Sequence, residues 1–321
     1  MIRTMDRKDV MALLTVAVFL ASLLLLVGVI RFANIAKANR VNQLLRTNAC
    51  TSCDLTGIVL KDADLEDMDL EYALLEGVDF RDTRLKRSNL NGANLNNANL
   101  KQADLRQTYL SDATLSGINL SDAQLQGADL RRAYLGDATL KEANLNAAYL
   151  GDAVFSRANL SGATFVEAYL VGANLGEANL KEADLEGADL RRAYLGDASL
   201  KGANLENAIL TRSNLTRTDL RGANLRGVTL NDADLSAANL EGANFTGGNL
   251  SRINLPRTRL VGTNFTNSNL LAANLRRADL TGANLTGANL MGANLTGVNL
   301  TGVLFCRTTM PNGTISRVEC Q

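Results

Sequence analysis

The chain has 321 residues, 46% of them hydrophobic, and its 33 basic and 33 acidic side chains cancel to a formal net charge of zero. This balance singles out no strongly charged partner. The sequence contains no histidine, which excludes Ser-His-Asp and Cys-His catalytic groups and histidine-based zinc sites. We therefore expect a protein that is not an enzyme, with no catalytic or metal-binding residues, no cofactor and no small-molecule substrate.

The N-terminal part of the chain is predicted to cross a lipid membrane once. Residues 1–9 form a short tail, and residues 10–30, VMALLTVAVFLASLLLLVGVI, hold no charge. As a helix these 21 residues span about 31 Å, close to the ~30 Å hydrocarbon core of a bilayer. Ala36-Lys37-Ala38 resembles a signal-peptide cleavage site, but the apolar run is longer than the usual roughly 7 to 15 residues, so we favour a retained anchor. Basic residues flank both ends of the run, so the positive-inside rule does not predict which end of the segment faces the cytoplasm.

A short amphipathic helix is predicted over residues 31–49. Apolar side chains recur at helical spacing through RFANIAKANRVNQLLRT, and the basic side chains lie mostly on the other face. Two roles stay open for this helix, which can lie on anionic lipid or cover the first turn of the domain that follows.

A five-residue period then runs without a break. From Leu55 to Phe305 every fifth residue is Leu or Phe, which gives 51 consecutive pentapeptides, and the residue two places before each centre is usually Ala. Neither a helix nor a flat strand has this period. One large and one small residue in five are therefore expected in the core, whereas the Asn or Asp before the centre and the two residues after it face solvent or form turns.

The A(N/D)LxG pattern closely resembles the pentapeptide-repeat family over residues 51–305. The resemblance implies an all-β solenoid, a right-handed quadrilateral β-helix in which four pentapeptides make one coil, with about 12 to 13 coils over residues 50–310. At ~4.8 Å per coil the rod is roughly 60 Å long, and its ends need caps. Residues 311–321, which begin with a Pro-Asn-Gly turn signal, are predicted to form a C-terminal cap hairpin.

Four pentapeptides per coil place residues 20 apart in one stack, which sorts the surface into faces. Beside one set of centres, basic side chains such as Lys61, Arg81 and Lys101 run next to acidic ones such as Asp62 and Asp82. We interpret this as a solvated face whose charges screen one another, since exposed pairs of this kind contribute ~0 to 1 kcal/mol.

A second set of residues is our candidate partner surface. Tyrosine or isoleucine replaces the usual Asn or Asp on two adjacent faces, near two Arg-Arg pairs. The set consists of Tyr109, Tyr149, Tyr169, Ile209, Tyr134, Tyr194, Arg131, Arg132, Arg191 and Arg192. Tyr and Arg are enriched in protein-binding hot spots. Stacking of these side chains between coils explains the pattern equally well. The copies of AYLGDA in which three of the tyrosines lie do not keep to one face, so we attribute them to duplication of coils.

The four cysteines occur only at the two ends of the repeats. Cys50 and Cys53 precede the first coil, and Cys306 and Cys320 follow the last. At a rod length of roughly 60 Å the two pairs cannot form one zinc site, and CxxC lacks the βαβ context of a redox motif. They remain candidate disulfides or buried thiols. Cys306 and Cys320 come opposite each other if the chain folds back after 310.

These observations favour a noncatalytic, membrane-anchored binding or scaffold protein, bacterial, that presents a rigid rod to an unknown protein partner. Cysteines confined to the caps favour repeats outside the cytoplasm, in the periplasm or a thylakoid lumen, and a cytoplasmic location is the alternative.

The family also includes DNA mimics that protect gyrase. Residues 51–310 hold 30 acids and 25 bases, too small an excess for such a mimic, so we expect no nucleic-acid mimicry and no nucleic-acid partner.

Overall fold

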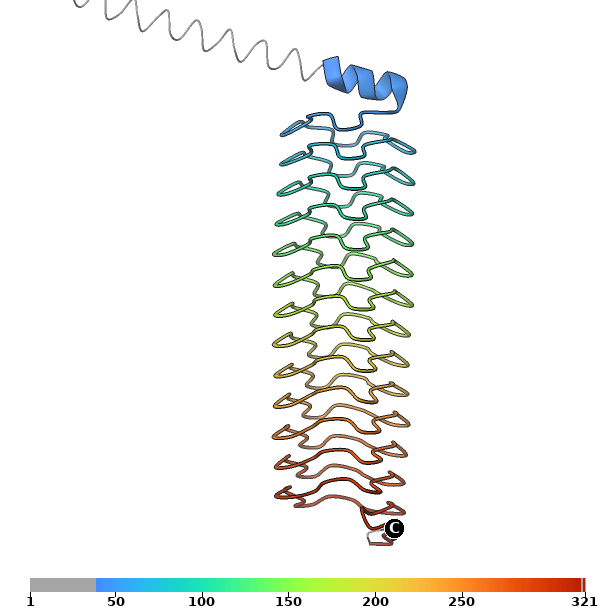
Figure 1. Ribbon diagram of the computed structural model, residues 1–321, viewed down its shortest axis with the longest axis vertical. Helices are drawn as coiled ribbons and strands as arrows, with labels where there is room; N and C mark the ends of the chain where they lie inside the picture. Colours follow the sequence, from blue (N-terminus) through green and yellow to red (C-terminus); the bar gives the residue numbers. More distant parts are fainter. Residues whose placement is uncertain (1–38, 319, 321) are drawn as a thin grey trace, which may run out of the picture. The chain divides into compact units, whose positions relative to one another are not determined.

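The computed structural model describes residues 39–318 and 320 (Figure 1). The predicted tail 1–9, the predicted membrane segment 10–30 and the first part of the predicted helix 31–49 lie outside these residues. Within the described part of the chain, no helix is long and apolar enough to cross a membrane. The chain divides into two compact units, Met1–Ala49 and Cys50–Gln321.

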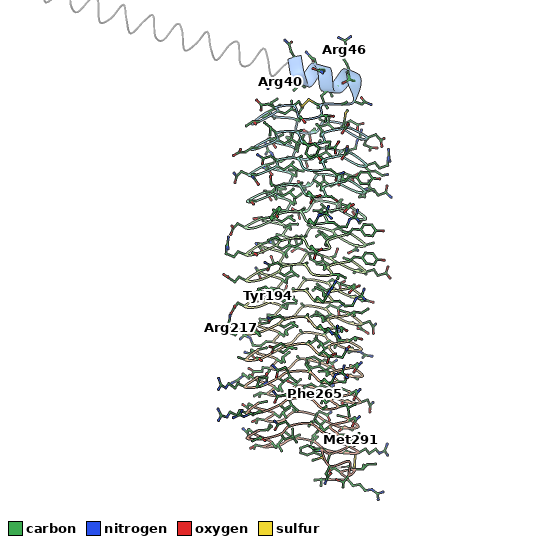
Figure 2. All side chains as sticks on the ribbon, in the orientation of Figure 1. Arg40, Arg46, Tyr194, Arg217, Phe265 and Met291 are labelled. Atoms are coloured by element: carbon green, nitrogen blue, oxygen red, sulfur yellow. A yellow bond between two sulfur atoms is a disulfide. The ribbon has the colours of Figure 1, made fainter. Side chains whose placement is uncertain are left out.

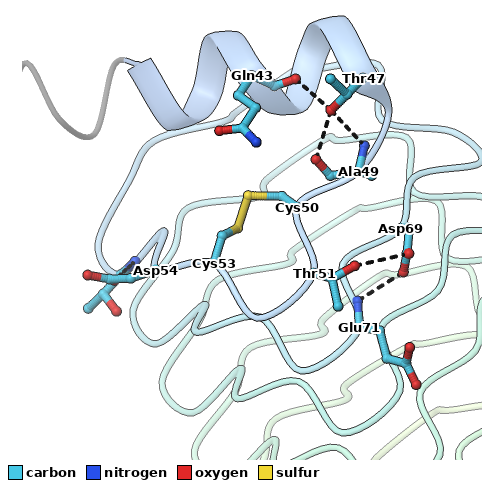
Figure 3. The surroundings of a disulfide bond; sticks show 10 residues. Gln43, Thr47, Ala49, Cys50, Thr51, Cys53, Asp54, Asp69 and Glu71 are labelled. Carbon is cyan, nitrogen blue, oxygen red and sulfur yellow. Dashed lines mark hydrogen bonds between the residues drawn. A yellow bond between two sulfur atoms is a disulfide. The ribbon is translucent and has the colours of Figure 1, made fainter.

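In the first unit, a helix spans residues 39–47. Asn48 ends it with a positive φ of 53°, and its N–H donates to the Leu44 carbonyl over 2.9 Å. The Thr47 hydroxyl donates to the Gln43 carbonyl over 2.9 Å, as Figure 3 shows. A left-handed residue of this kind is a common way to end a helix, because it turns the chain away from the axis.

The second unit is a β-helix of stacked coils (Figure 1). Parallel bridges join each face residue to the one 20 places further on, from Asp54–Leu74 to Asn289–Thr309. Four pentapeptides therefore complete one coil, and the bridging residues form four parallel stacks. This confirms the quadrilateral β-helix, whereas the number of 12 to 13 coils stays a prediction.

A pentapeptide with Asn or Asp before its centre can satisfy all five of its backbone N–H groups, as residues 99–103 illustrate. The N–H groups of Asn99, Leu100 and Gln102 donate to carbonyls of adjacent coils over 2.9, 2.7 and 2.9 Å. Ala103 closes a β-turn by donating to the Leu100 carbonyl over 3.1 Å. The remaining N–H, on Lys101, donates to the Asn99 side-chain oxygen over 3.2 Å. Asn and Asp therefore recur before the centre because their side chains accept the one N–H that the coils leave over.

The second residue of each turn has the left-handed conformation that its β-turn requires. Gly172 has a φ of 73°, for example, but Asp62 and Arg217 adopt φ of 59° and 57° at equivalent places. The turn therefore accepts long charged side chains as well as glycine, and these side chains line the four corners of the rod.

The core is the predicted ladder of large and small side chains. Every centre from Leu55 to Leu290 is buried, together with most of the alanines two places earlier. Phe265, which is labelled in Figure 2, stacks on Phe245 of the coil before it, with ring centroids 5.1 Å apart. Where a hydroxyl replaces alanine, it is satisfied internally, as in Ser88, which donates to the Leu65 carbonyl over 2.7 Å.

The C-terminal end of the rod is covered only in part. Thr309 and Ile315 form an antiparallel bridge, and the Ser316 N–H donates to the Thr308 carbonyl over 2.8 Å. This short hairpin leaves the last core positions open, since Leu300 is 37% exposed and the centres Leu295 and Phe305 are only half-buried. The core ladder is thus no longer fully buried over the last three pentapeptides of the period.

Candidate functional site

The candidate partner surface lies on two adjacent faces and on the corner between them. We call its residues the Tyr–Arg surface. One face carries Tyr109, Tyr149, Tyr169 and Ile209 in one bridged stack, the next face carries Tyr134 and Tyr194, and the corner carries Arg131, Arg132, Arg191 and Arg192. The structure therefore brings all ten sequence-predicted residues to one side of the rod.

The tyrosines of this surface are both exposed and stacked. Tyr109, Tyr149 and Tyr169 are 49–51% exposed, so about half of each side chain is available to a partner. Tyr149 and Tyr169 also stack in successive coils, with ring centroids 5.3 Å apart and planes 6° from parallel. Stacking holds the two rings in a fixed orientation and leaves half of each ring exposed. The tyrosines can therefore both stack between coils and contact a partner.

Tyr194 differs from the other tyrosines because it lies over two glycines. A Cβ added at Gly176 would come within 2.6 Å of the Tyr194 ring, and one added at Gly196 within 2.5 Å of its hydroxyl. Tyr194 is accordingly the least exposed tyrosine among the described residues, at 40%. The sequence did not indicate a role for either glycine, because their contact with Tyr194 depends on the orientation of the Tyr194 side chain.

Three of the four arginines are held by aspartates that the sequence did not single out. The Arg131 Nε and Nη2 donate to the Asp129 carboxylate over 2.8 and 2.5 Å. Arg191 binds Asp189 in the same way, over 2.8 and 2.6 Å. Arg132 instead binds Asp112, one coil away, over 2.8 and 2.6 Å. Such two-point pairs fix the guanidinium planes and cancel most of the positive charge that the sequence suggested.

A hollow of about 720 Å³ opens between Tyr109 and Tyr149. Asp129 lies between the two rings in the same stack, and Arg131 lines the adjacent wall. Burial opposes ionisation of Asp129, but hydrogen bonds from Arg131 and Ser111 outweigh it and hold the pKa of the carboxyl below its usual value of 3.8. The hollow therefore has two aromatic walls and a paired, ionised floor.

The lowered pKa values predict that acid destabilises the rod. Burial raises the pKa of Asp189 as well, yet its bonds to Arg191 leave the pKa below 3.8. The pKa values of Asp129 and Asp189 are lower in the folded chain than in the unfolded chain, so their ionised carboxylates stabilise the fold. This stabilisation is complete above pH 3.8 and is lost as the pH falls through the folded pKa values. We expect the melting temperature to drop more steeply below pH 4 in the unmodified chain than in Asp129→Asn/Asp189→Asn. An equally steep drop in both would contradict this assignment. The control Asp152→Asn removes a carboxylate for which the described residues offer no ion pair.

The basic and acidic ladders lie on the corner of the rod opposite Arg131 and Arg132. Lys61 lies 3.6 Å from Asp62 and 3.8 Å from Asp82, and Arg81 binds Asp79 over 2.6 Å. Lys61, Asp62 and Asp82 are exposed and pair loosely, and exposed pairs of this kind contribute little to stability or attraction. Asp79, which the sequence did not single out, is more buried and binds Arg81 at two points.

Both cysteine pairs form disulfides. Cys50 and Cys53 are joined within the first turn, with Cα atoms 5.3 Å apart (Figure 3). Cys306 is joined to Cys320, with Cα atoms 4.7 Å apart. Over residues 39–318 and 320, no group of three or more His, Cys, Asp or Glu side chains could hold a metal ion.

Comparison with known families decides the classification of the chain. The model of the family "Pentapeptide repeats" matches eight copies, over residues 50–87, 88–123, 118–157, 158–197, 193–232, 233–270 and 272–310. The chain belongs to the pentapeptide repeat family. No curated protein matches it.

Solved structures of other pentapeptide repeat proteins also match. HetL, involved in heterocyst differentiation regulation in the cyanobacterium Nostoc sp. strain PCC 7120, is 27% identical, with 86% of this chain and 98% of HetL covered and a TM-score of 0.33. The plasmid-mediated fluoroquinolone resistance protein QnrB1 is 17% identical, with 62% and 93% covered and a TM-score of 0.27. Rfr23 from the cyanobacterium Cyanothece 51142 is 26% identical, with 54% and 99% covered and a TM-score of 0.25.

Proposed function

We propose that this pentapeptide repeat protein is a noncatalytic binding protein that presents the Tyr–Arg surface to a protein partner. The observation that carries the proposal is the row of half-exposed tyrosines beside a hollow whose floor is the Asp129–Arg131 pair. Aromatic rings held in place lose little conformational freedom on binding, and Tyr and Arg contribute a large share of the free energy at protein interfaces.

The electrostatics of the surface support a partner with a mixed polar and apolar face. Asp129 and Asp189 hold Arg131 and Arg191 in fixed positions, so a partner meets oriented N–H groups with little net charge. The hollow between Tyr109 and Tyr149 would take one protruding side chain. A strongly acidic partner is not required, because most of the arginine charge is already matched.

We also infer that residues 10–30 anchor the protein in a lipid membrane and that the repeats lie outside the cytoplasm, in a periplasm or thylakoid lumen. The uncharged run in the sequence supports the anchor. The disulfides at the two ends of the repeats support an oxidising compartment. Labelling intact and lysed cells with a membrane-impermeant maleimide, with and without prior reduction, tests the location. Thiols labelled only after lysis and without reductant would place the repeats in the cytoplasm.

The test of the partner surface is a photo-crosslinking residue placed at Tyr149 of the full chain in its native cells. We expect one defined crosslinked species, which is absent when the probe replaces Tyr72. Tyr72 is the matched control because it is 58% exposed and lies in the same corner as Arg132 but three coils before it, beyond the ten residues of the surface.

The crosslinked partner then gives a quantitative test. Tyr149→Ala/Tyr169→Ala should weaken its binding at least about tenfold, since hot-spot side chains contribute ~2 kcal/mol or more. Tyr72→Ala should change the affinity less than about threefold. Crosslinks of equal yield at both positions, or unchanged affinity in the double variant, would show that the Tyr–Arg surface is not the binding site.

A further inference from the structure

Ten arginines occupy the second turn position of the repeats, and five of them face a carboxylate one coil before them. Five such arginines bind the aspartate 20 residues earlier, with Nε and Nη2 each donating over 2.5–2.8 Å. The pairs are Arg87–Asp67, Arg132–Asp112, Arg157–Asp137, Arg217–Asp197 and Arg252–Asp232. In each pair the arginine side chain leans back across one coil to its anion.

Two arginines further along one corner lack this carboxylate. Arg257 and Arg277 continue the corner that holds Arg157 and Arg217, but the residue 20 before Arg257 is Ala237, and the residue 20 before Arg277 is Arg257 itself. Neither guanidinium forms a hydrogen bond or ion pair with another residue in the described part of the chain. Two like charges therefore occupy successive coils, about 4.8 Å apart along the axis.

A third arginine completes the group. Arg276 precedes Arg277 in the same turn, and its side chain likewise has no partner among the described residues. The three arginines line a hollow of about 430 Å³, and Asn254 and Asn274 form part of its wall. The Asn274 amide donates to the Asn254 oxygen over 2.8 Å, which holds the wall in place.

The acids around this hollow do not neutralise it. Asp234, on one of the two adjoining faces, already accepts hydrogen bonds from the Ser236 N–H and the Asn254 amide, over 2.9 Å in each case. Residues 253–318 contain six arginines but a single acid, Asp279. Asp279 lies on the second face that adjoins this corner, where it accepts hydrogen bonds from the Thr281 N–H and hydroxyl. Arg192 and Arg212 also lie in successive coils of one corner, but an acid, Asp232, follows them there. A hydrogen bond from Arg252 lowers the pKa of Asp232 most, and the charge of Arg212 lowers it further.

We propose that Arg257, Arg276 and Arg277 form a binding site for a tetrahedral dianion, such as inorganic phosphate or the terminal phosphate of a monoester. Arginine offers several N–H donors in one plane, and three guanidiniums on two coils can surround one group whose oxygens point in several directions. A long polyanion does not fit, because the same corner carries Asp137, Glu177 and Asp197 in earlier coils. The bound dianion takes the place of the carboxylates that pair with the other corner arginines.

The experiment is isothermal titration of the full chain, in a nonionic detergent at constant ionic strength, with inorganic phosphate. A second titration uses dihexanoyl phosphatidic acid, a soluble lipid with a phosphomonoester headgroup, and dihexanoyl phosphatidylcholine is its zwitterionic control. We expect saturable binding of one dianion per chain that weakens at least about tenfold in Arg257→Gln/Arg276→Gln/Arg277→Gln.

The matched control is Arg157→Gln/Arg217→Gln/Arg252→Gln, which removes the same charge from paired arginines and should bind phosphate within about threefold of the unmodified chain. Preference for inorganic phosphate would identify a free anion as the ligand, and preference for phosphatidic acid a lipid headgroup. Both results support the site. Non-saturable binding, or an equal loss in the two triple variants, would overturn it, because the arginines would then attract anions only through net charge. Thermal unfolding of each variant verifies that the exposed substitutions leave the fold intact.

Discussion

Leu185→Ala is expected to lower the free energy of unfolding by about 2 to 5 kcal/mol. Leu185 is completely buried in the middle of the rod, between the equivalent centres Phe165 and Leu205 of the adjacent coils. The substitution leaves a cavity that a stack of hydrogen-bonded coils cannot close, because coil spacing is set by the backbone ladder. Urea denaturation followed by circular dichroism measures the loss.

Leu300→Ala is the matched control for this prediction. It removes the same atoms from the same sequence position of a later pentapeptide, but Leu300 is 37% exposed at the open end of the core. We expect a loss below about 1 kcal/mol, as for other partly exposed sites. Equal losses for the two variants would mean that the end of the rod is covered as fully as its middle. In a solenoid, coils interact with their nearest neighbours only, so the position of a cavity along the axis decides its cost.

Cys306→Ser/Cys320→Ser is expected to destabilise the C-terminal hairpin locally by about 3 kcal/mol. The disulfide closes a loop with a sequence separation of 14, and a cross-link of that length restricts the unfolded state by roughly this amount. The hairpin has few other restraints, since Ile315 is 65% exposed. Without the disulfide, its backbone hydrogen bonds should open far more often.

Hydrogen exchange reports this opening residue by residue. The Met310 and Ser316 amides, bonded to Thr314 over 2.7 Å and to Thr308 over 2.8 Å, should exchange about 100-fold faster in the double variant. Cys50→Ser/Cys53→Ser should leave these two amides unchanged, because that disulfide lies at the other end of the unit. Unchanged exchange in Cys306→Ser/Cys320→Ser would show that the bridge at Thr309 and Ile315 suffices to hold the end.

The fold and the core followed from the sequence because every coil repeats the same local rule. The period indicated that one large and one small residue in five are buried, and the resemblance of the A(N/D)LxG pattern to the pentapeptide-repeat family implied four pentapeptides per coil. Since residues 20 apart must then stack, the placement of Tyr149 and Tyr169 on one face, and of Tyr134 on the next, could also be predicted. The role of Asn and Asp as acceptors of a leftover N–H was not predicted, although the regular spacing carried the signal.

The partners of the charged side chains were decided only by the tertiary structure. The sequence alone does not say that Arg131 binds Asp129 within its own coil whereas Arg132 reaches Asp112 in the coil before. Stacking brings several acids within reach of each arginine, and the direction of the side chain from its turn position selects one of them. The same geometry leaves Arg257 and Arg277 without a carboxylate, because Asp–Arg pairing depends on what stands one coil earlier. The sequence period thus determines the face or corner on which each side chain lies, and the three-dimensional packing of the coils determines which residues it contacts.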